Sequence, residues 1–294
     1  MTTLAFPKPS PRTAVAALVF GAVFVGLFWH TFAWMAERFR VHDTFYSHGW
    51  LIPFACAWLI WQRRARLAGL PAGPSYAGLA LLAPAMLVHV LATLWDVHFV
   101  SGFAMLAVVW GLVWTLWGGA VLWALRFPML YLVFMVPLPS VLLIAASFAM
   151  KMWAASLATG MIHAMGIPAV QAGSMIHVPG VSVIVDDTCS GLRSLISLIA
   201  LSVLWVSLLP AGAKRWHKLA IVVASVPIAL AANMARIMIL VLTAAIYGSK
   251  VAEGYIHYGS GFVVFGVALA ALAGLSRVLA GRSASTAPVG RGAS

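Results

Sequence analysis

Residues 98–119, HFVSGFAMLAVVWGLVWTLWGG, form an apolar run without a single Asp, Glu, Lys or Arg. An α-helix needs roughly 20 consecutive apolar residues to cross the hydrocarbon core of a bilayer, so this run predicts a transmembrane helix. The whole chain has the same character, because 63% of its 294 residues are hydrophobic, 8% are charged and the mean hydropathy is +1.02. Ordinary soluble domains carry about three times that share of charge. The sequence therefore predicts an all-α polytopic membrane protein.

Apolar runs recur along the chain and predict about eight transmembrane helices in a single integral membrane domain over residues 1–280. The predicted spans cover residues 14–35, 48–62, 76–95, 98–119, 121–137, 190–209, 218–247 and 258–279. The first run is too long for the apolar part of a cleaved signal peptide, so we expect it to be retained. Residues 281–294 are small and polar and predict a disordered cytoplasmic tail.

The charged residues orient these spans. With the N-terminus in the cytoplasm, 12 of the 18 Lys and Arg residues fall on the cytoplasmic side and all six acidic residues fall on the other. Basic loops on the cytoplasmic side are what sets the orientation of membrane proteins. The net charge of +12 is thereby explained without a nucleic-acid partner, and no soluble segment interleaves basic and aromatic residues.

Residues 140–188 interrupt the pattern and are predicted to form an extracytoplasmic insert before the sixth span. Its first part is apolar, and either lies in the membrane interface as a helix or dips into the bundle. Its second part, SMIHVPGVSVIVDD at 174–187, places Pro179-Gly180 between two β-branched runs and predicts a β-hairpin. The hairpin leads directly to Cys189, which is consistent with a substrate-docking element and equally with a connecting loop.

Cys189 lies in the segment DDTCSGLRSL, at or near the start of a predicted helix. The positive end of a helix dipole and a cation one turn away, here Arg193, both favour a thiolate. Asp186 and Asp187 act in the opposite direction. The sequence therefore offers Cys189 as a nucleophile, against the alternative of a small buried apolar residue. Cys56 has no charged neighbour and is expected to serve in packing.

Arg236 lies inside a predicted span, in LAANMARIMIL, where a charge costs about 2.5–3.5 kcal/mol on insertion scales. Its guanidinium could hold a carboxylate, or stabilise a thiolate or an oxyanion. The alternative is a structural ion pair with Asp186 or Asp187. Asn233 is three residues earlier on the same helix face and could donate a hydrogen bond in the same site.

Two histidines are further candidates. His257, in GYIHYGSGF, opens the last predicted span and is a candidate proton carrier, against the alternative of an interfacial residue between Tyr255 and Tyr258. His48 opens the second predicted span and could contact substrate or support the site, or could be a polar span end. No metal or cofactor is expected, because the sequence has no P-loop, GxGxxG, HExxH or CxxC pattern.

Together these residues resemble the exosortase/archaeosortase family. The resemblance is carried by CSGLRS at 189–194, N-x-x-R at 233–236, the histidine that opens the last span, D-x-x-YSHGWLIP at 43–53 and FPMLYLVFMVPLP at 127–139. An acidic residue two positions before the cysteine, here Asp187, also suits the family pattern.

The resemblance implies a cysteine protease or transpeptidase of the inner membrane, with both termini cytoplasmic and the active site facing the periplasm. Its expected partners are membrane lipid and membrane-anchored proteins with a C-terminal sorting signal of the PEP-CTERM type: a short motif, one apolar span and a basic cluster. Cys189 would form an acyl-enzyme, His257 would protonate the leaving amine, and Arg236 would stabilise the oxyanion. The acyl acceptor is left open between water and an envelope glycan or lipid.

Three other functions remain open at this stage. The chain could be a transporter or a non-catalytic membrane subunit of an exopolysaccharide export system, because a charge inside a span suits a transport path as well. It could also be a catalytically silent scaffold. Against transport, the sequence has no inverted repeat, and the polar candidates gather at one face of the membrane.

Overall fold

The computed structural model describes residues 11–40, 45–186, 190–210, 212–248 and 257–285, with residues 13, 14, 257, 258 and 281–285 described by their helix alone. Within this part the chain is mostly helical, and it divides into two compact units, Met1–Pro139 and Ser140–Ser294. Each unit is described by itself. Cys189 and Asp187 lie outside the described residues, as does the side chain of His257.

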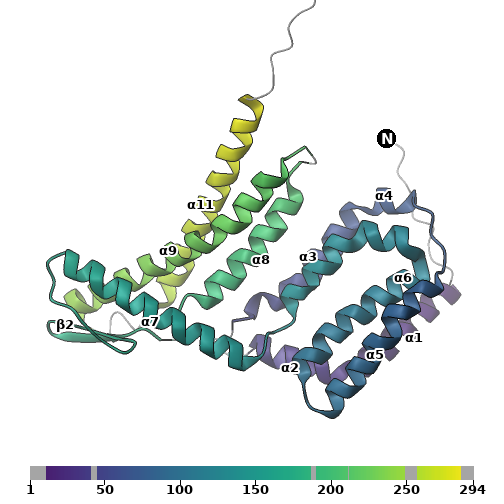
Figure 1. Ribbon diagram of the computed structural model, residues 1–294, viewed down its shortest axis with the longest axis horizontal. Helices are drawn as coiled ribbons and strands as arrows, with labels where there is room; N and C mark the ends of the chain where they lie inside the picture. The colour runs from purple at the N-terminus through teal and green to yellow at the C-terminus, as the bar shows by residue number, and fades with distance from the viewer. Residues whose placement is uncertain (1–10, 41–44, 187–189, 211, 249–256, 286–294) are drawn as a thin grey trace, which may run out of the picture. The chain divides into compact units, whose positions relative to one another are not determined.

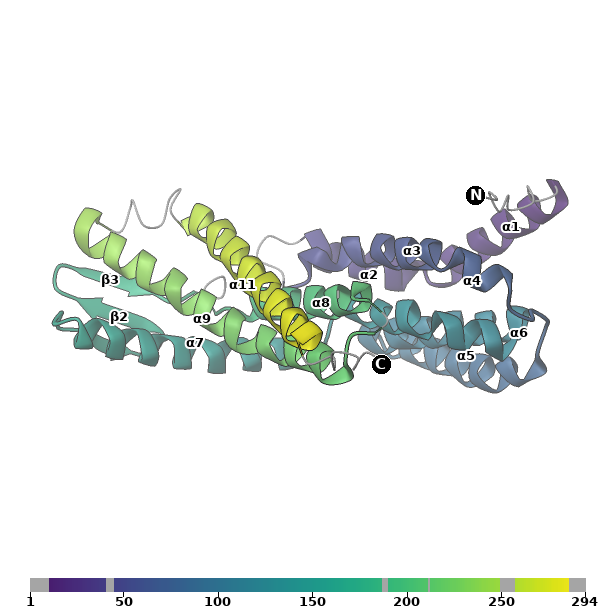
Figure 2. The same ribbon diagram turned by 90° about the horizontal axis from the view of Figure 1, so that it is seen from above.

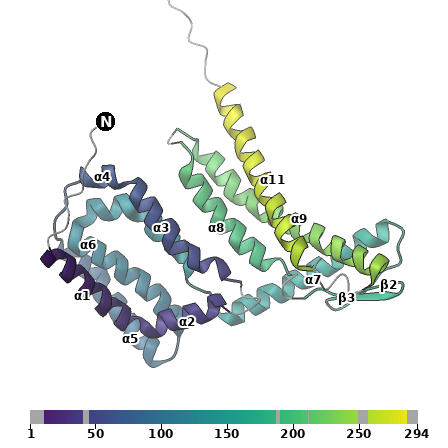
Figure 3. The ribbon, with the colours of Figure 1, turned by 180° about the vertical axis from the view of Figure 1, so that it is seen from behind.

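All the regular elements described in the first unit are helices. Its elements are α1 (Pro11–Leu27), α2 (Trp29–Arg40), η1 (Ser47–Trp50), α3 (Leu51–Gln62), α4 (Arg64–Ala68), η2 (Tyr76–Gly78), α5 (Leu79–Leu94), α6 (His98–Tyr131) and η3 (Leu132–Met135). Helices α5 and α6 lie side by side (Figure 3). They approach closely at Gly111, where an added Cβ would lie 2.9 Å from the backbone of Leu82.

Helices α1 and α2 meet at an angle of 70°, within the segment predicted as the first span. A buried polar network lies at this bend: Thr31 Oγ1 is 2.6 Å from Ser101 Oγ, which is 2.8 Å from His89 Nδ1. The Nε2 atom of His89 is 3.3 Å from the carbonyl oxygen of Leu27, at the last residue of α1. A helix end leaves carbonyls without intrahelical partners, and here a side chain from α5 compensates one of them.

Helix α6 consists of two helices joined across a kink at Gly118, whose φ of 83° is left-handed. The kink falls at the end of the predicted fourth span, 98–119. The part before the kink packs against α5. The part after it contacts α3, where the Cys56 thiol donates to the carbonyl of Pro128 at 3.1 Å and Arg63 lies 5.6 Å from the ring centroid of Phe127.

The second unit combines helices with a small sheet. Its elements are α7 (Ser140–Ala164), β1 (Val170–Ala172), β2 (Met175–Val178), β3 (Val181–Ile184), α8 (Leu192–Leu208), α9 (Arg215–Tyr247) and α11 (His257–Ser285). Helix α7 has 25 residues and is apolar enough to cross a membrane, although the sequence analysis placed it in an extracytoplasmic insert. Helix α11 reaches Ser285, inside the segment expected as a disordered tail.

The three strands form an antiparallel sheet in the order β1-β2-β3. Strands β2 and β3 pair from Met175↔Ile184 to Val178↔Val181, around a turn at Pro179 and Gly180. This is the segment in which the sequence analysis expected a hairpin. One face of the sheet is buried against α7 and α9, in a core of Ala154, Ala155, Ala158, Ile162, Ile176, Val178, Val185, Ile237, Met238, Leu240 and Val241 (Figure 2).

Helices α8, α9 and α11 lie side by side, with α9 in contact with both neighbours (Figure 1). Their shared core is built from Leu198, Val206, Ile221, Ala229, Ala268, Leu272 and Leu279. Trp205 of α8 also donates its indole N–H to Ser276 of α11 at 3.2 Å. These contacts hold α8, α9 and α11 together, and the candidate site residues lie at the start of α8 and in the middle of α9.

The described residues contain five helices long and apolar enough to cross a membrane, or six if α1 and α2 form one bent span. The predicted span 48–62 is occupied by η1 and by α3, whose 12 residues are shorter than a bilayer crossing. The predicted spans 98–119 and 121–137 are counted here within one element, α6 with η3. The expected count of eight spans is therefore not confirmed, while the multi-pass membrane character is clear.

Candidate functional site

The candidate site is organised around the first residues of α8. Gly191 precedes the helix with a left-handed φ of 81°, and the N–H of Leu192 donates to the buried hydroxyl of Ser190 at 3.3 Å. Ser190 thus compensates one of the N–H groups that a helix start leaves without an intrahelical partner. Cys189 lies outside the described residues, immediately before Ser190 in the chain. It therefore precedes α8 by three positions.

The start of α8 is in tight contact with α9 through Gly191 and Asn233. A Cβ added to Gly191 would lie 2.7 Å from Cγ and 2.8 Å from Nδ2 of Asn233. Asn233 is only 6% exposed. Glycine is therefore required at position 191 on two grounds, the left-handed backbone and the space that the Asn233 amide occupies. The contact holds the segment that follows Cys189 against α9.

Arg236 lies one helical turn after Asn233 along α9, on the same face of the helix. Its side chain is half-buried and lies beside the backbone of α11, since a Cβ added to Gly261 would be 3.6 Å from its Cζ atom. Helix α11 begins at His257, one turn before Gly261 and on the same face of the helix. The backbone therefore places positions 236 and 257 on neighbouring parts of α9 and α11.

A small cavity joins the three helices at this point. It is lined by Ser194, Leu198, Ala229, Ala232, Asn233, Arg236, Gly261, Val264, Phe265 and Ala268. Its volume is about 10 Å³, the lower limit for one water molecule. Arg236 and Asn233, which the sequence analysis singled out, thus share one cavity. Ser194 and Gly261 share it too, and they were missed as site residues although both belong to the quoted motifs.

The other candidates are placed differently. Arg193 is half-buried in the first turn of α8, and its relation to Cys189 stays a prediction. Asp186 is exposed just after β3, and its predicted ion pair with Arg236 stays a prediction as well. His48 belongs to the first unit, where its ring stacks on Tyr46 with centroids 5.7 Å apart.

Cys56, the second cysteine, is buried in the first unit and 4% exposed. Its thiol donates to the main-chain carbonyl of Pro128 at 3.1 Å. These contacts fit the packing role expected from the sequence. Among the described residues, no cluster of three or more His, Cys, Asp and Glu side chains could hold a metal ion.

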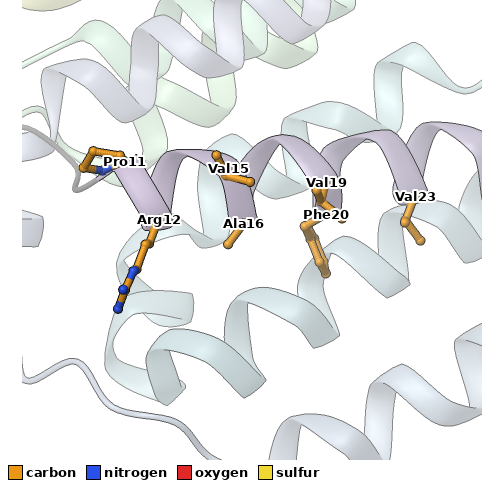
Figure 4. A pocket seen from close by; sticks show the side chains of 7 residues that line it. All are labelled: Pro11, Arg12, Val15, Ala16, Val19, Phe20 and Val23. Carbon is orange, nitrogen blue, oxygen red and sulfur yellow. The ribbon is translucent and has the colours of Figure 1, made fainter.

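An open hollow of a different kind lies along α1 (Figure 4). Its described walls are formed by Pro11, Arg12, Val15, Ala16, Val19, Phe20 and Val23, and Arg12 is the ionisable group among these residues. The exposed apolar side chains of α1, such as Leu18 at 73%, suit contact with lipid. None of these seven residues could act as a nucleophile or a proton carrier.

Comparison with curated proteins and with solved structures gives no match. The model of the transmembrane exosortase family matches residues 34–274, which is most of the chain. The match covers the Gly191–Asn233 contact and the helices α8, α9 and α11 as far as residue 274. The chain therefore belongs to the transmembrane exosortase family.

Proposed function

We propose that the chain is a membrane cysteine protease or transpeptidase that cleaves C-terminal sorting signals of exported proteins through an acyl-enzyme on Cys189. The observation that carries the proposal is the convergence of Asn233 and Arg236 on the start of α8, directly after Cys189, beside the first turn of α11. A nucleophile, a cation for a developing oxyanion and a proton carrier are the groups that acyl transfer requires.

In the proposed reaction the Cys189 thiol loses its proton to His257, and the sulfur attacks the carbonyl carbon of the scissile amide. Arg236 stabilises the negative charge on the carbonyl oxygen, which needs a cation that cannot itself lose a proton. The C–N bond then breaks, and the imidazolium of His257 returns the proton to the leaving amine. The thioester that remains on Cys189 is attacked by water or by an amine or hydroxyl acceptor on an envelope glycan or lipid.

Asn233 has a positioning role in this proposal. Its amide lies against Gly191, two residues after the nucleophile, and it shares a cavity with Arg236. A side chain in this place fixes the distance between the cysteine segment and the guanidinium. Arg193, Asp187 and His48 are further candidates for contacts with the substrate or for support of the catalytic residues.

The substrates in this proposal are proteins with a PEP-CTERM-like tail, anchored by their own apolar span in the inner membrane. The proposal places both termini in the cytoplasm. Cys189 then opens toward the periplasm, on the side that holds the six acidic residues. A membrane-impermeant maleimide added to intact spheroplasts should therefore label Cys189 in the Cys56→Ala variant.

The experiment that tests the function follows the size of a tagged substrate by blot in cells that make the protein. Wild type and Cys56→Ala should both shorten the substrate, because the Cys56 thiol is buried and donates to the main-chain carbonyl of Pro128. Cys189→Ala should leave the substrate at full length, and Cys189→Ser should process it slowly. Normal processing by Cys189→Ala would exclude the covalent mechanism and favour a transport or scaffolding role in polysaccharide export.

A further inference from the structure

The sheet of the second unit has an open edge at β3. In an antiparallel ladder, alternate residues of a strand bond to the same neighbour. The N–H of Val185 donates to the carbonyl of Ser174 at 2.9 Å, so residues 181, 183 and 185 direct their main-chain groups toward β2. The N–H and C=O groups of Ser182 and Ile184 therefore point the other way, out of the sheet.

Nothing in the described part of the chain pairs with this edge. The sheet order β1-β2-β3 ends at β3. The hydroxyl of Ser182 bonds to Nδ1 of His177 at 2.7 Å, which ties this side chain back onto β2. Ile184 is 59% exposed. Soluble proteins protect such edges with charges or proline, because an open edge invites another strand, and Val181–Ile184 contains neither.

The opposite face of β3 is packed into the core of the second unit. Val185 is 2% exposed and Ile176 is fully buried, and both belong to the core that also contains Ile237 and Val241 of α9. Ile162 of α7 completes this core. A strand fixed in this way presents its donors and acceptors at constant spacing, which lowers the entropic cost of binding an extended chain.

The edge also leads directly to the proposed nucleophile. Ile184 and Cys189 are five residues apart, so at most about 17 Å of extended chain separates them. We propose that the outer edge of β3 binds the extended polypeptide segment beside the scissile bond of the substrate, as a fourth strand of the sheet. The inference rests on the proposed function and specifies how that site recognises its substrate.

The occupant must be a polypeptide, because an edge strand offers alternating main-chain donors and acceptors that another extended chain reproduces and a lipid does not. Affinity would come from the main chain. Selection by sequence would come from every second substrate side chain, on the face shared by Ser182 and Ile184. A substrate already anchored in the same membrane by its own span needs only this short contact.

Disulfide cross-linking tests the inference without catalysis. In a Cys56→Ala, Cys189→Ala background, Ile184→Cys is paired with single cysteines placed one by one along the substrate segment outside its span. Copper phenanthroline supplies the oxidant. We expect cross-links at alternate substrate positions, because successive side chains of a strand point to opposite faces.

The control is Val170→Cys on β1, which is 65% exposed on the same face of the sheet but at the opposite edge. Cross-linking without this periodicity, or equally from position 170, would overturn the inference. So would a disulfide-linked dimer of two protein copies through position 184.

A second measurement uses the outward N–H of Ile184. Ile184→Pro removes this donor and Ile184→Ala keeps it, and neither breaks a hydrogen bond to β2. Processing should be at least about threefold slower in the proline variant than in the alanine variant, from one lost hydrogen bond. Alkylation of Cys189 by a small maleimide should stay equal. Equal processing by the two variants would overturn the inference. If wild type processes nothing while the periodic cross-links persist, the proposed function fails and the docking edge stands.

Discussion

Gly191→Ala should destabilise the protein strongly, for two separable reasons. The φ of 81° places the new side chain in the left-handed region, which costs about 1–2 kcal/mol. Its Cβ would also lie 2.7 Å from Cγ of Asn233, and overpacking of this kind costs about 1–3 kcal/mol. The sum is about 2–5 kcal/mol, a large part of the roughly 5–15 kcal/mol that stabilises a typical fold.

Gly180→Ala is the matched control, because its φ is 83° and no atom lies within 4 Å of an added Cβ. It should cost only the backbone part, about 1–2 kcal/mol. Both changes lower the entropy of the unfolded chain equally, so that effect cancels in the comparison. The difference in unfolding free energy between the two variants, measured in detergent, reports the Gly191–Asn233 contact alone.

A double variant completes the test. Asn233→Ala in the Gly191→Ala background removes Cγ and Nδ2, the two atoms nearest to the added Cβ, and leaves only Cβ of residue 233 at 3.0 Å. It should therefore recover part of the roughly 1–3 kcal/mol overpacking cost relative to the sum of the single changes. The reasoning is refuted if Gly191→Ala and Gly180→Ala cost the same and the double variant is simply additive. The start of α8 would then not be held by Asn233, and the proposed positioning role of this amide would be lost.

Two further predictions concern the proposed chemistry and the first unit. Arg236→Ala should lower the rate of substrate processing about 100- to 1,000-fold. Arg236→Lys should recover only part of the lost rate, because lysine lacks the planar donor fork of the guanidinium. Equal rates in Arg236→Ala and wild type would exclude a role for the guanidinium in the transition state. Ser101→Ala should destabilise the fold by about 1–3 kcal/mol, because it leaves the Nδ1 atom of His89 and the hydroxyl of Thr31 without their shared partner. An unchanged melting temperature in detergent would argue against the network at the bend between α1 and α2.

The sequence predicted the helical membrane character well because lipid exposure leaves a direct trace in composition. It predicted less about how the helices break. Apolar runs do not record that the chain bends by 70° around Phe28, since the compensating partner of the Leu27 carbonyl is His89, which is 62 positions away. The sequence predicted a boundary between two spans at residues 119–121, where the structure has a kink at Gly118 inside α6.

In the candidate site, too, local sequence features could be predicted, whereas contacts between distant residues could not. Arg236 was identified as a candidate from the sequence because a charge inside an apolar run is costly in a membrane. Asn233 followed because it lies three residues earlier on the same helix face. Gly261 and Ser194 could not be found by such reasoning, since neither is costly in a membrane helix and their role depends on how α8, α9 and α11 pack. The contact between Gly191 and Asn233 joins residues 42 positions apart in the sequence, so no local pattern predicts it.

The central claim is that Cys189 carries a covalent intermediate. The most direct test is mass spectrometry of the peptide that contains Cys189, after the protein is mixed with a membrane-anchored substrate and quenched in acid. The account predicts an acyl adduct of the substrate on Cys189, released by neutral hydroxylamine because a thioester yields a free thiol and a hydroxamate. A shortened substrate without any adduct on Cys189, together with normal processing by Cys189→Ala, would contradict it.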